Sequence, residues 1–193
     1  MDLSSAIRFQ GRLPMEEVRA LTDSASSFHE RFVRLFDANS DRMFRYFNRL
    51  AGESELAADL VQEAFVRLYQ RGSMPDSPEA WLITVGMNLL RNEKTTRSRR
   101  LRLLTPARGD HALGDPPASP EDAATAAESR RQVRAALERL PERDRQMLLL
   151  QAEGYHYREI AAALRLNEAS IGVMLARARV AFREAFGEIS DAY

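Results

Sequence analysis

The chain has 193 residues, the length of one large or two small domains, and an ordinary globular composition with 45% hydrophobic and 29% charged residues. It contains no cysteine, which excludes a disulfide framework, a thiolate zinc site and a cysteine nucleophile. Its longest apolar stretch, Trp81 to Leu90, is too short to span a bilayer, and its first residues do not resemble a signal peptide. We therefore expect no membrane insertion and a cytoplasmic location.

The formal net charge is zero, but the charges are unevenly distributed. From Arg91 to Arg108 the chain carries seven basic residues and only Glu93 as an acid, a net charge of +6. Because nucleic acid responds to the local potential and not to the whole-chain sum, this stretch predicts phosphate binding. The alternative is a solvated helix end whose cations interact with the helix dipole.

The first part of the chain is typical of three helices. Apolar residues recur at three- and four-residue steps from Phe28 to Leu50, and Gly52 ends this stripe. A second amphipathic helix is expected from Ser54 to Arg71. Ser77-Pro78-Glu79 has the residue types that open a helix, and this third helix runs into the basic stretch. No alternating strand pattern occurs.

Residues 102–120 are rich in proline and glycine and predict a flexible linker. A second helical block follows, in which two short helices, 157–164 and 168–186, are joined by three residues with Asn167 as the N-cap. We expect an all-α fold with two small helical domains, the second a helix-turn-helix. The predicted boundaries are an N-terminal extension over 1–23, a first domain over 24–101, the linker over 102–120 and a second domain over 121–187.

Short motifs occur in a fixed order along both blocks. They are Ala58-Asp59-Leu60-Val61-Gln62-Glu63-Ala64-Phe65, Ala80-Trp81-Leu82 with Asn88, Leu140-Pro141-Glu142-Arg143, Leu148-Leu149-Leu150, Tyr157-Arg158-Glu159-Ile160-Ala161 and Arg177-Ala178-Arg179. Together they resemble the extracytoplasmic-function (ECF) class of bacterial sigma factors over roughly Phe28 to Phe186. The resemblance implies that the first block is the family's domain two and the second its domain four.

The resemblance implies a polymerase-binding face on the second helix. Asp59, Gln62 and Glu63 lie on its polar side, away from Leu60 and Phe65. In the family this face docks on the coiled-coil clamp of the largest subunit of RNA polymerase, and domain four meets the flap of the second-largest subunit. A polar helix face suits a reversible interface, although a simply solvated face has the same composition.

The resemblance also implies a site for unpaired bases of the minus-ten element, formed by the loop before the third helix and by that helix. The matching candidates here are Gly72, Ser73, Asp76, Trp81, Asn88, Arg91, Asn92, Arg97, Arg99 and Arg100. Opening duplex DNA needs a pocket that offsets the lost stacking, and Gly72, Ser73 and Asp76 could offer hydrogen bonds to a base edge. The alternative for Trp81 is ordinary packing in the core.

The helix-turn-helix would read the minus-thirty-five element from the major groove. The candidates are Tyr157, Arg158, Arg165, Asn167, Glu168, Ser170, Arg177 and Arg179. The family commonly has basic residues mid-helix where this chain has Gly172 and Met174, so we expect readout by Asn167 and Ser170 with phosphate contacts from the arginines.

Catalysis has little support in the sequence. The three histidines, His29, His111 and His156, have no partner at metal-ligand or triad spacing, and we expect no catalytic residue, metal or cofactor. The expected partners are core RNA polymerase, promoter DNA and an anti-sigma factor. Two alternatives stay open: a helix-turn-helix regulator that acts without polymerase, and a helical enzyme.

Overall fold

The computed structural model describes residues 15–101 and 120–190, and side chains over residues 27–97 and 127–189. Within these ranges all regular structure is α-helical, which confirms the expected fold class. The helices are α1 (Met15–Ala51), α2 (Ser54–Arg71), α3 (Pro78–Leu101), α4 (Pro120–Arg139), α5 (Glu142–Ala152), α6 (Tyr157–Leu164) and α7 (Glu168–Ser190). None of the described helices combines the length and apolar character that crossing a membrane requires.

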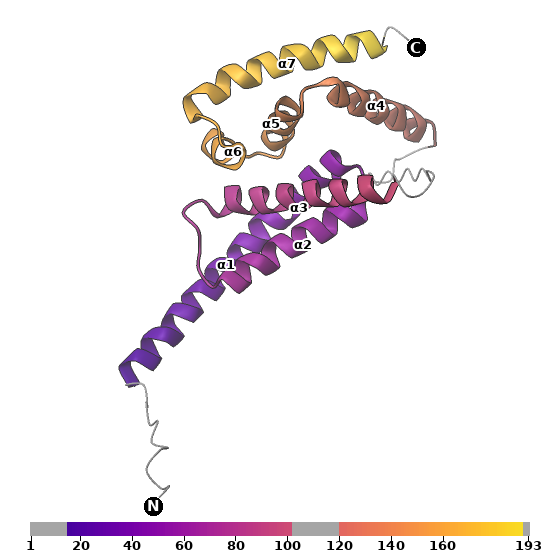
Figure 1. Cartoon of the computed structure of the whole chain (residues 1–193). Helices are drawn as coiled ribbons and strands as arrows, with labels where there is room; N and C mark the ends of the chain where they lie inside the picture. The colour runs from indigo at the N-terminus through magenta and orange to yellow at the C-terminus, as the bar shows by residue number, and fades with distance from the viewer. Residues whose placement is uncertain (1–14, 102–119, 191–193) are drawn as a thin grey trace, which may run out of the picture.

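Helices α1, α2 and α3 form the N-terminal unit, in which α2 lies along both of its neighbours (Figure 1). The amphipathic stripes meet in a core whose largest fully buried side chains include Met43, Phe47, Leu68 and Leu82. Gly52 has a φ of 78°, a left-handed conformation that favours glycine and allows the sharp turn from α1 into α2. Helix α1 begins at Met15, so the domain boundary drawn at residue 24 falls inside it.

Helices α1 and α3 approach closely at Gly86. A Cβ atom at this position would lie 2.3 Å from Cζ of Phe47 and 2.6 Å from its Cε2. Because Phe47 is fully buried, its ring has no free space to move into. Because glycine has no Cβ atom, Gly86 allows α1 and α3 to pack this closely.

Helices α4 to α7 form the C-terminal unit. Met147, Leu150, Ile160, Ile171 and Leu175 fill the core between α5, α6 and α7, while α4 packs along α7. The helix-turn-helix has the expected starting residues, and α7 continues four residues beyond the expected end.

Local polar contacts hold the two ends of α6 and the start of α7. The backbone N–H of His156 donates a hydrogen bond of 2.6 Å to the Glu159 carboxylate, which is half of a capping box. Arg165 ends α6 with a left-handed φ of 56°. The Asn167 side chain accepts a hydrogen bond of 3.0 Å from the Ala169 N–H, which confirms Asn167 as the N-cap of α7.

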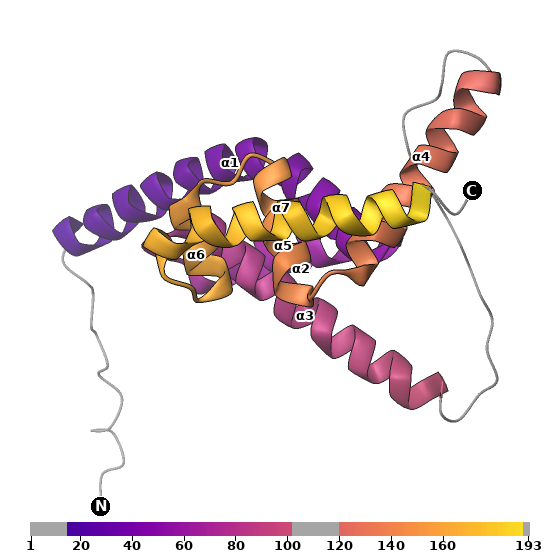
Figure 2. The same cartoon turned by 90° about the horizontal axis from the view of Figure 1, so that it is seen from above.

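The two units pack against each other. Helix α3 contacts α6, α1 contacts α5, and buried side chains of both units join into one hydrophobic cluster. Figure 1 shows α4–α7 stacked over α1–α3, with α7 on the outer side of the stack, and Figure 2 shows α7 lying across the molecule from above. Most of the predicted linker, residues 102–119, lies outside the described residues.

Candidate nucleic-acid and polymerase interfaces

The polar face of α2 is open to solvent. Asp59 and Gln62 are exposed, and Glu63 is partly exposed and accepts a hydrogen bond of 2.8 Å from Nε of Arg67, one turn further on. Leu60 and Val61, on the other side of the helix, are buried. The structure thus brings the three predicted polymerase-binding residues onto one accessible surface.

The loop before α3 and the start of α3 lie next to each other at one end of the N-terminal unit. Gly72 is in the left-handed region with a φ of 69°, and Ser73 and Asp76 are exposed. Trp81 is half-buried: part of its ring packs on the core, and the Arg71 guanidinium lies 5.9 Å from the ring centroid. Core packing therefore accounts for only part of this side chain.

Further along α3 the predicted DNA-binding residues differ in their contacts. Asn88 and Arg91 are exposed, and the Arg91 guanidinium donates a hydrogen bond of 3.1 Å to the Asn88 side chain. Asn92 is also exposed, whereas Arg97 forms an ion pair with Glu53 at the α1–α2 turn. The side chains of Arg99 and Arg100 lie outside the described residues.

A basic groove separates α3 from α5 and α6. It consists of two adjoining cavities of about 510 and 440 Å³ that share Met87, Arg91, Glu142 and Gln146. The other charged residues that line it are Lys94, Arg143, Arg145 and Arg165, all cationic. The predicted positive surface of α3 therefore faces a second set of cations across the groove.

The helix-turn-helix presents most of its predicted residues to solvent. Exposed are Tyr157, Arg158, Arg165, Asn167, Glu168, Ser170, Arg177 and Arg179. Arg179 is partly engaged, because its guanidinium donates a hydrogen bond of 2.7 Å to the side chain of Gln151 on α5.

Two positions singled out from the sequence, Gly172 and Met174, do not lie on the outer face of α7. A Cβ atom at Gly172 would meet the Tyr157 ring at 3.6 Å, and Met174 packs against the core. The outward position between them is Val173, whose side chain is 56% exposed. Periodicity could have identified it, since buried Ile171 and Leu175 fix the inner face.

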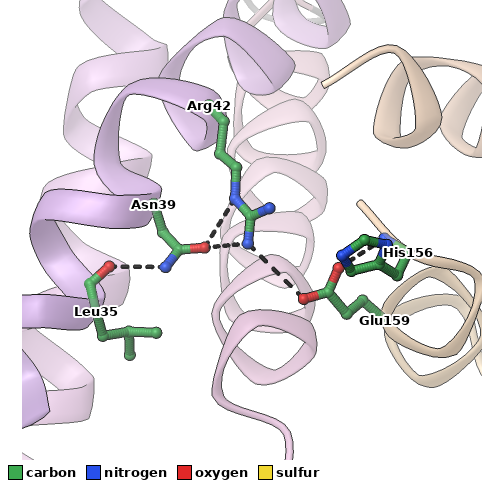
Figure 3. A network of polar contacts seen from close by, with 5 residues as sticks. All are labelled: Leu35, Asn39, Arg42, His156 and Glu159. Atoms are coloured by element: carbon green, nitrogen blue, oxygen red, sulfur yellow. Dashed lines mark hydrogen bonds and ion pairs between the residues drawn. The ribbon is translucent and has the colours of Figure 1, made fainter. Parts of the chain in front are cut away.

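A polar network that the sequence did not indicate joins the two units (Figure 3). The Arg42 guanidinium on α1 donates a hydrogen bond of 2.8 Å to the Asn39 side chain and lies 3.8 Å from the Glu159 carboxylate on α6. Asn39 in turn donates a hydrogen bond of 2.8 Å to the backbone carbonyl of Leu35. The same guanidinium covers the Tyr155 ring, 4.1 Å from its centroid.

Glu153, at the end of α5, is a second ionic contact between the units. Its carboxylate forms ion pairs of 2.7 Å with both Arg45 and Arg49 of α1, and only 3% of its side chain is exposed. Burial also raises the pKa of the nearby Tyr155 hydroxyl and that of Tyr46 on α1, whose hydroxyl lies near Tyr155, Glu142 and Arg145 of the C-terminal unit. Both tyrosines therefore stay protonated at neutral pH.

Among the described residues, no group of three or more histidine, cysteine, aspartate or glutamate side chains could hold a metal ion. The polar surfaces of α2, α3 and the helix-turn-helix are exposed helix faces, which can bind macromolecules. An exposed helix-turn-helix next to a second helical unit with a basic groove defines the class of DNA-binding transcription proteins.

Comparison with known proteins gives the family. The model named Sigma-70 region 2 matches residues 35–100, and the one named Sigma-70, region 4 matches residues 130–182. The ECF RNA polymerase sigma factor SigL of Mycobacterium tuberculosis is 30% identical over 142 residues, which cover 71% of this chain and 78% of SigL. The chain belongs to the ECF family of RNA polymerase sigma factors.

Other relatives are longer than this chain. The ECF RNA polymerase sigma factor SigE of Mycolicibacterium smegmatis is 29% identical over 149 residues, 76% of this chain and 58% of SigE. The chain spans about half the length of the first curated relatives it matches, between 42% and 58%. Among solved structures, the fold is similar to the sigma factor RpoE in complex with the anti-sigma factor NepR from Bartonella quintana, with a TM-score of 0.61, 19% identity, and coverage of 82% of this chain and 98% of that chain.

Proposed function

We propose that the chain binds core RNA polymerase, directs it to a class of promoters and helps to separate the DNA strands at the start site. It performs no chemistry itself, because the polymerase carries the active site. The observation that carries this proposal is the exposure of three separate surfaces: the acidic face of α2, the α3 surface with its preceding loop, and the helix-turn-helix. A repressor that acts without polymerase would need only the last of these.

In this proposal each surface has one partner. Asp59, Gln62 and Glu63 dock on the clamp of the largest subunit, and the C-terminal unit docks on the flap of the second-largest subunit. The loop and α3 residues from Gly72 to Arg100 hold the minus-ten element. The helix-turn-helix residues from Tyr157 to Arg179 hold the minus-thirty-five element. Location in the cytoplasm follows from binding to polymerase.

The proposed domains are residues 24–101 and 121–187, joined by residues 102–120. Elements named minus-ten and minus-thirty-five are about 25 base pairs apart, or about 85 Å of B-form DNA at 3.4 Å per base pair. Helix α3 packs directly on α6 in this structure, so the two units cannot contact both elements in this arrangement. We infer that the packed arrangement belongs to the free protein and that the two units separate when the chain binds polymerase.

RpoE was solved with an anti-sigma factor, and we propose that a protein inhibitor of that kind binds this chain.

Binding to purified core polymerase tests the proposal directly. Reversing the charge of both Asp59 and Glu63 to arginine should weaken binding by at least tenfold, because the acidic face would then repel its partner. The control reverses Asp37 and Asp41, two exposed acids one turn apart on α1 with the same spacing. Equal binding of both double variants and the wild type would exclude the α2 face, and no binding by the wild type would refute the proposed function.

A further inference from the structure

The outer face of α7 is apolar although no described residue covers it. Its exposed apolar side chains recur at three- and four-residue steps along the helix, at Ala169, Val173, Ala176 and Val180, with Arg177 beside them. The inner face already contributes Ile171, Leu175 and Ala178 to the core. Apolar residues on both sides of a helix that packs on one side only indicate that the second side has a partner.

The position of α7 makes this face accessible even while the two units are packed together. Helix α7 lies on the outer side of the molecule, and α5 and α6 separate it from α1–α3 (Figure 1). Exposed cations surround the start of the helix, with Arg158 on α6, Arg165 in the turn and Arg177 two turns along. A partner with a negative border and an apolar centre fits this distribution of charge.

Val173 is the large side chain at the centre of that surface. It lies in the second turn of α7 and is 56% exposed, one turn from Ser170 on one side and from Arg177 on the other. The first turns of a recognition helix are the part that meets base edges. A valine cannot read a hydrogen-bond pattern, so the feature it can recognise in the major groove is the methyl group of thymine.

We propose that Val173 packs against a thymine methyl group in the upstream promoter element and thereby specifies an A·T base pair at one position. This inference rests on the proposed function, since it names the base that the helix-turn-helix prefers. Ala169 and Ala176 on either side of Val173 are small, so the helix backbone can approach the bases closely. Val180 is seven residues further along, about 10 Å, and lies beyond the helix start that enters the groove deepest.

The test uses the full chain assembled with core polymerase. Duplex promoters with a randomised upstream region are selected for binding, and each thymine of the selected element is then replaced singly by deoxyuridine, which lacks only the methyl group. We expect one replacement to weaken binding of the wild type about fourfold, the effect of one buried methyl group at ~0.8 kcal/mol. The Val173→Ala variant should bind the thymine and uracil duplexes equally at that position.

Two further variants sharpen the test. Val180→Ala is the matched control, an exposed valine on the same face of α7, and it should keep the discrimination between thymine and uracil. Val173→Asn should move the selected base at this position from thymine to adenine, because a carboxamide pairs with N6 and N7 of adenine. Both valines are exposed, so their replacement should leave the fold intact, and the helicity of each variant is measured as a check.

Three results would overturn the inference. The first is that no replacement of thymine by deoxyuridine weakens binding, and the second is that the Val173→Ala variant still distinguishes thymine from uracil. The third is that Val173→Ala loses polymerase binding without a change in base preference, which would assign this face to a protein partner. If no upstream element is selected although polymerase binding depends on Asp59 and Glu63, the helix-turn-helix part of the proposed function fails as well. Selection of an element that ignores Val173 would refute only this inference.

Discussion

Nε of Arg45 on α1 donates a hydrogen bond of 2.7 Å to the carboxylate of Glu153, 108 residues away at the end of α5. Arg49, one turn further along α1, forms an ion pair of 2.7 Å with the same carboxylate. Only 3% of the Glu153 side chain is exposed, so the two guanidinium groups supply the charge partners of a buried carboxylate, of which Oε2 accepts a hydrogen bond and Oε1 accepts none. The contact between the N-terminal and C-terminal units therefore depends on charge as well as on apolar packing.

We predict that Glu153→Gln weakens the packing of the two units. The neutral amide leaves two arginines without their charge partner, which should lower the free energy of unfolding by about 1–3 kcal/mol. The chain has no cysteine, so spin labels can be attached at Arg34→Cys on α1 and Glu184→Cys on α7. The distance between the labels should become longer and more broadly distributed in the variant.

The control for this prediction is Glu188→Gln. It removes an exposed ion pair of 2.9 Å with Arg139 that lies entirely within the C-terminal unit. Such a pair contributes less than about 1 kcal/mol, and its loss should leave the label distance unchanged. A Glu153→Gln variant with the wild-type distance distribution would show that apolar packing alone holds the units together.

A second prediction concerns alkaline pH. Burial raises the pKa of Tyr46 above its ordinary value of about 10, with smaller contributions from Tyr155 and Glu142. The unfolded chain therefore releases this proton near pH 10 while the folded chain keeps it. The contribution of Tyr46 to the free energy of unfolding is fully present below pH 10. As the pH rises further, this contribution decreases by about 1.4 kcal/mol per pH unit.

Tyr46→Phe should reduce this alkaline loss of stability, measured as the free energy of unfolding in urea between pH 8 and pH 11. At neutral pH the variant should be as stable as the wild type or slightly more so, since the Tyr46 hydroxyl has no hydrogen-bond partner among the described residues. Tyr69→Phe is the control, because Tyr69 is 53% exposed. The idea fails if both variants respond to pH as the wild type does.

The third prediction concerns the approach of α1 and α3. Gly86→Ala places a methyl group where the buried Phe47 ring lies, and overpacking of this kind should destabilise the chain by about 1–3 kcal/mol. Gly187→Ala is the matched control, because it also lies in a helix but a Cβ atom there meets nothing within 4 Å. The control should be neutral or stabilising by up to about 1 kcal/mol.

Phe47→Leu combined with Gly86→Ala tests the cause of that effect. A shorter side chain at position 47 makes room for the new methyl group, so the double variant should lose less stability than the two single variants predict together. Additive losses in thermal unfolding would mean that the Phe47 ring is not the obstacle.

The fourth prediction concerns the basic end of α3. Arg97 is held by Glu53, so Glu53→Gln should release a cation for DNA phosphate. In the polymerase holoenzyme, one added phosphate contact should steepen the plot of log affinity against log salt by about 0.9. Glu55→Gln, which also removes one exposed acid near the start of α2, should change the slope less. Equal slopes for both variants would place Arg97 away from the DNA.

The starts and ends of most helices could be predicted from sequence because they depend on local chemistry. Asn167 caps α7 whatever packs around it, and Gly52 and Gly72 adopt the left-handed conformation that ends a helix. The rotation of α7 about its own axis could not be assigned in the same way. Successive residues of an α-helix are rotated by about 100° around its axis. The sequence comparison with the family concerned positions 172 and 174, and it therefore did not identify Val173, which lies between them and points outward.

The ion pair between Arg45 and Glu153 could not be predicted from the sequence for a different reason. An arginine on the polar side of an amphipathic helix has the same pattern whether it faces water or a carboxylate from another part of the chain. The polar face of α2 could be predicted, by contrast, because the buried Leu60 and Val61 fix the inner side of that helix.

Helix α1 has two occupied sides, and this limits how the molecule can open. Met43 and Phe47 anchor one side in the N-terminal core, while Arg42, Arg45 and Arg49 on the other hold the C-terminal unit. The helix cannot roll about its axis to release the arginines without pulling Met43 and Phe47 out of their sites. Opening must then be a rigid-body departure of α4–α7, in which the ion pairs along α1 break nearly together, and this would make the transition abrupt.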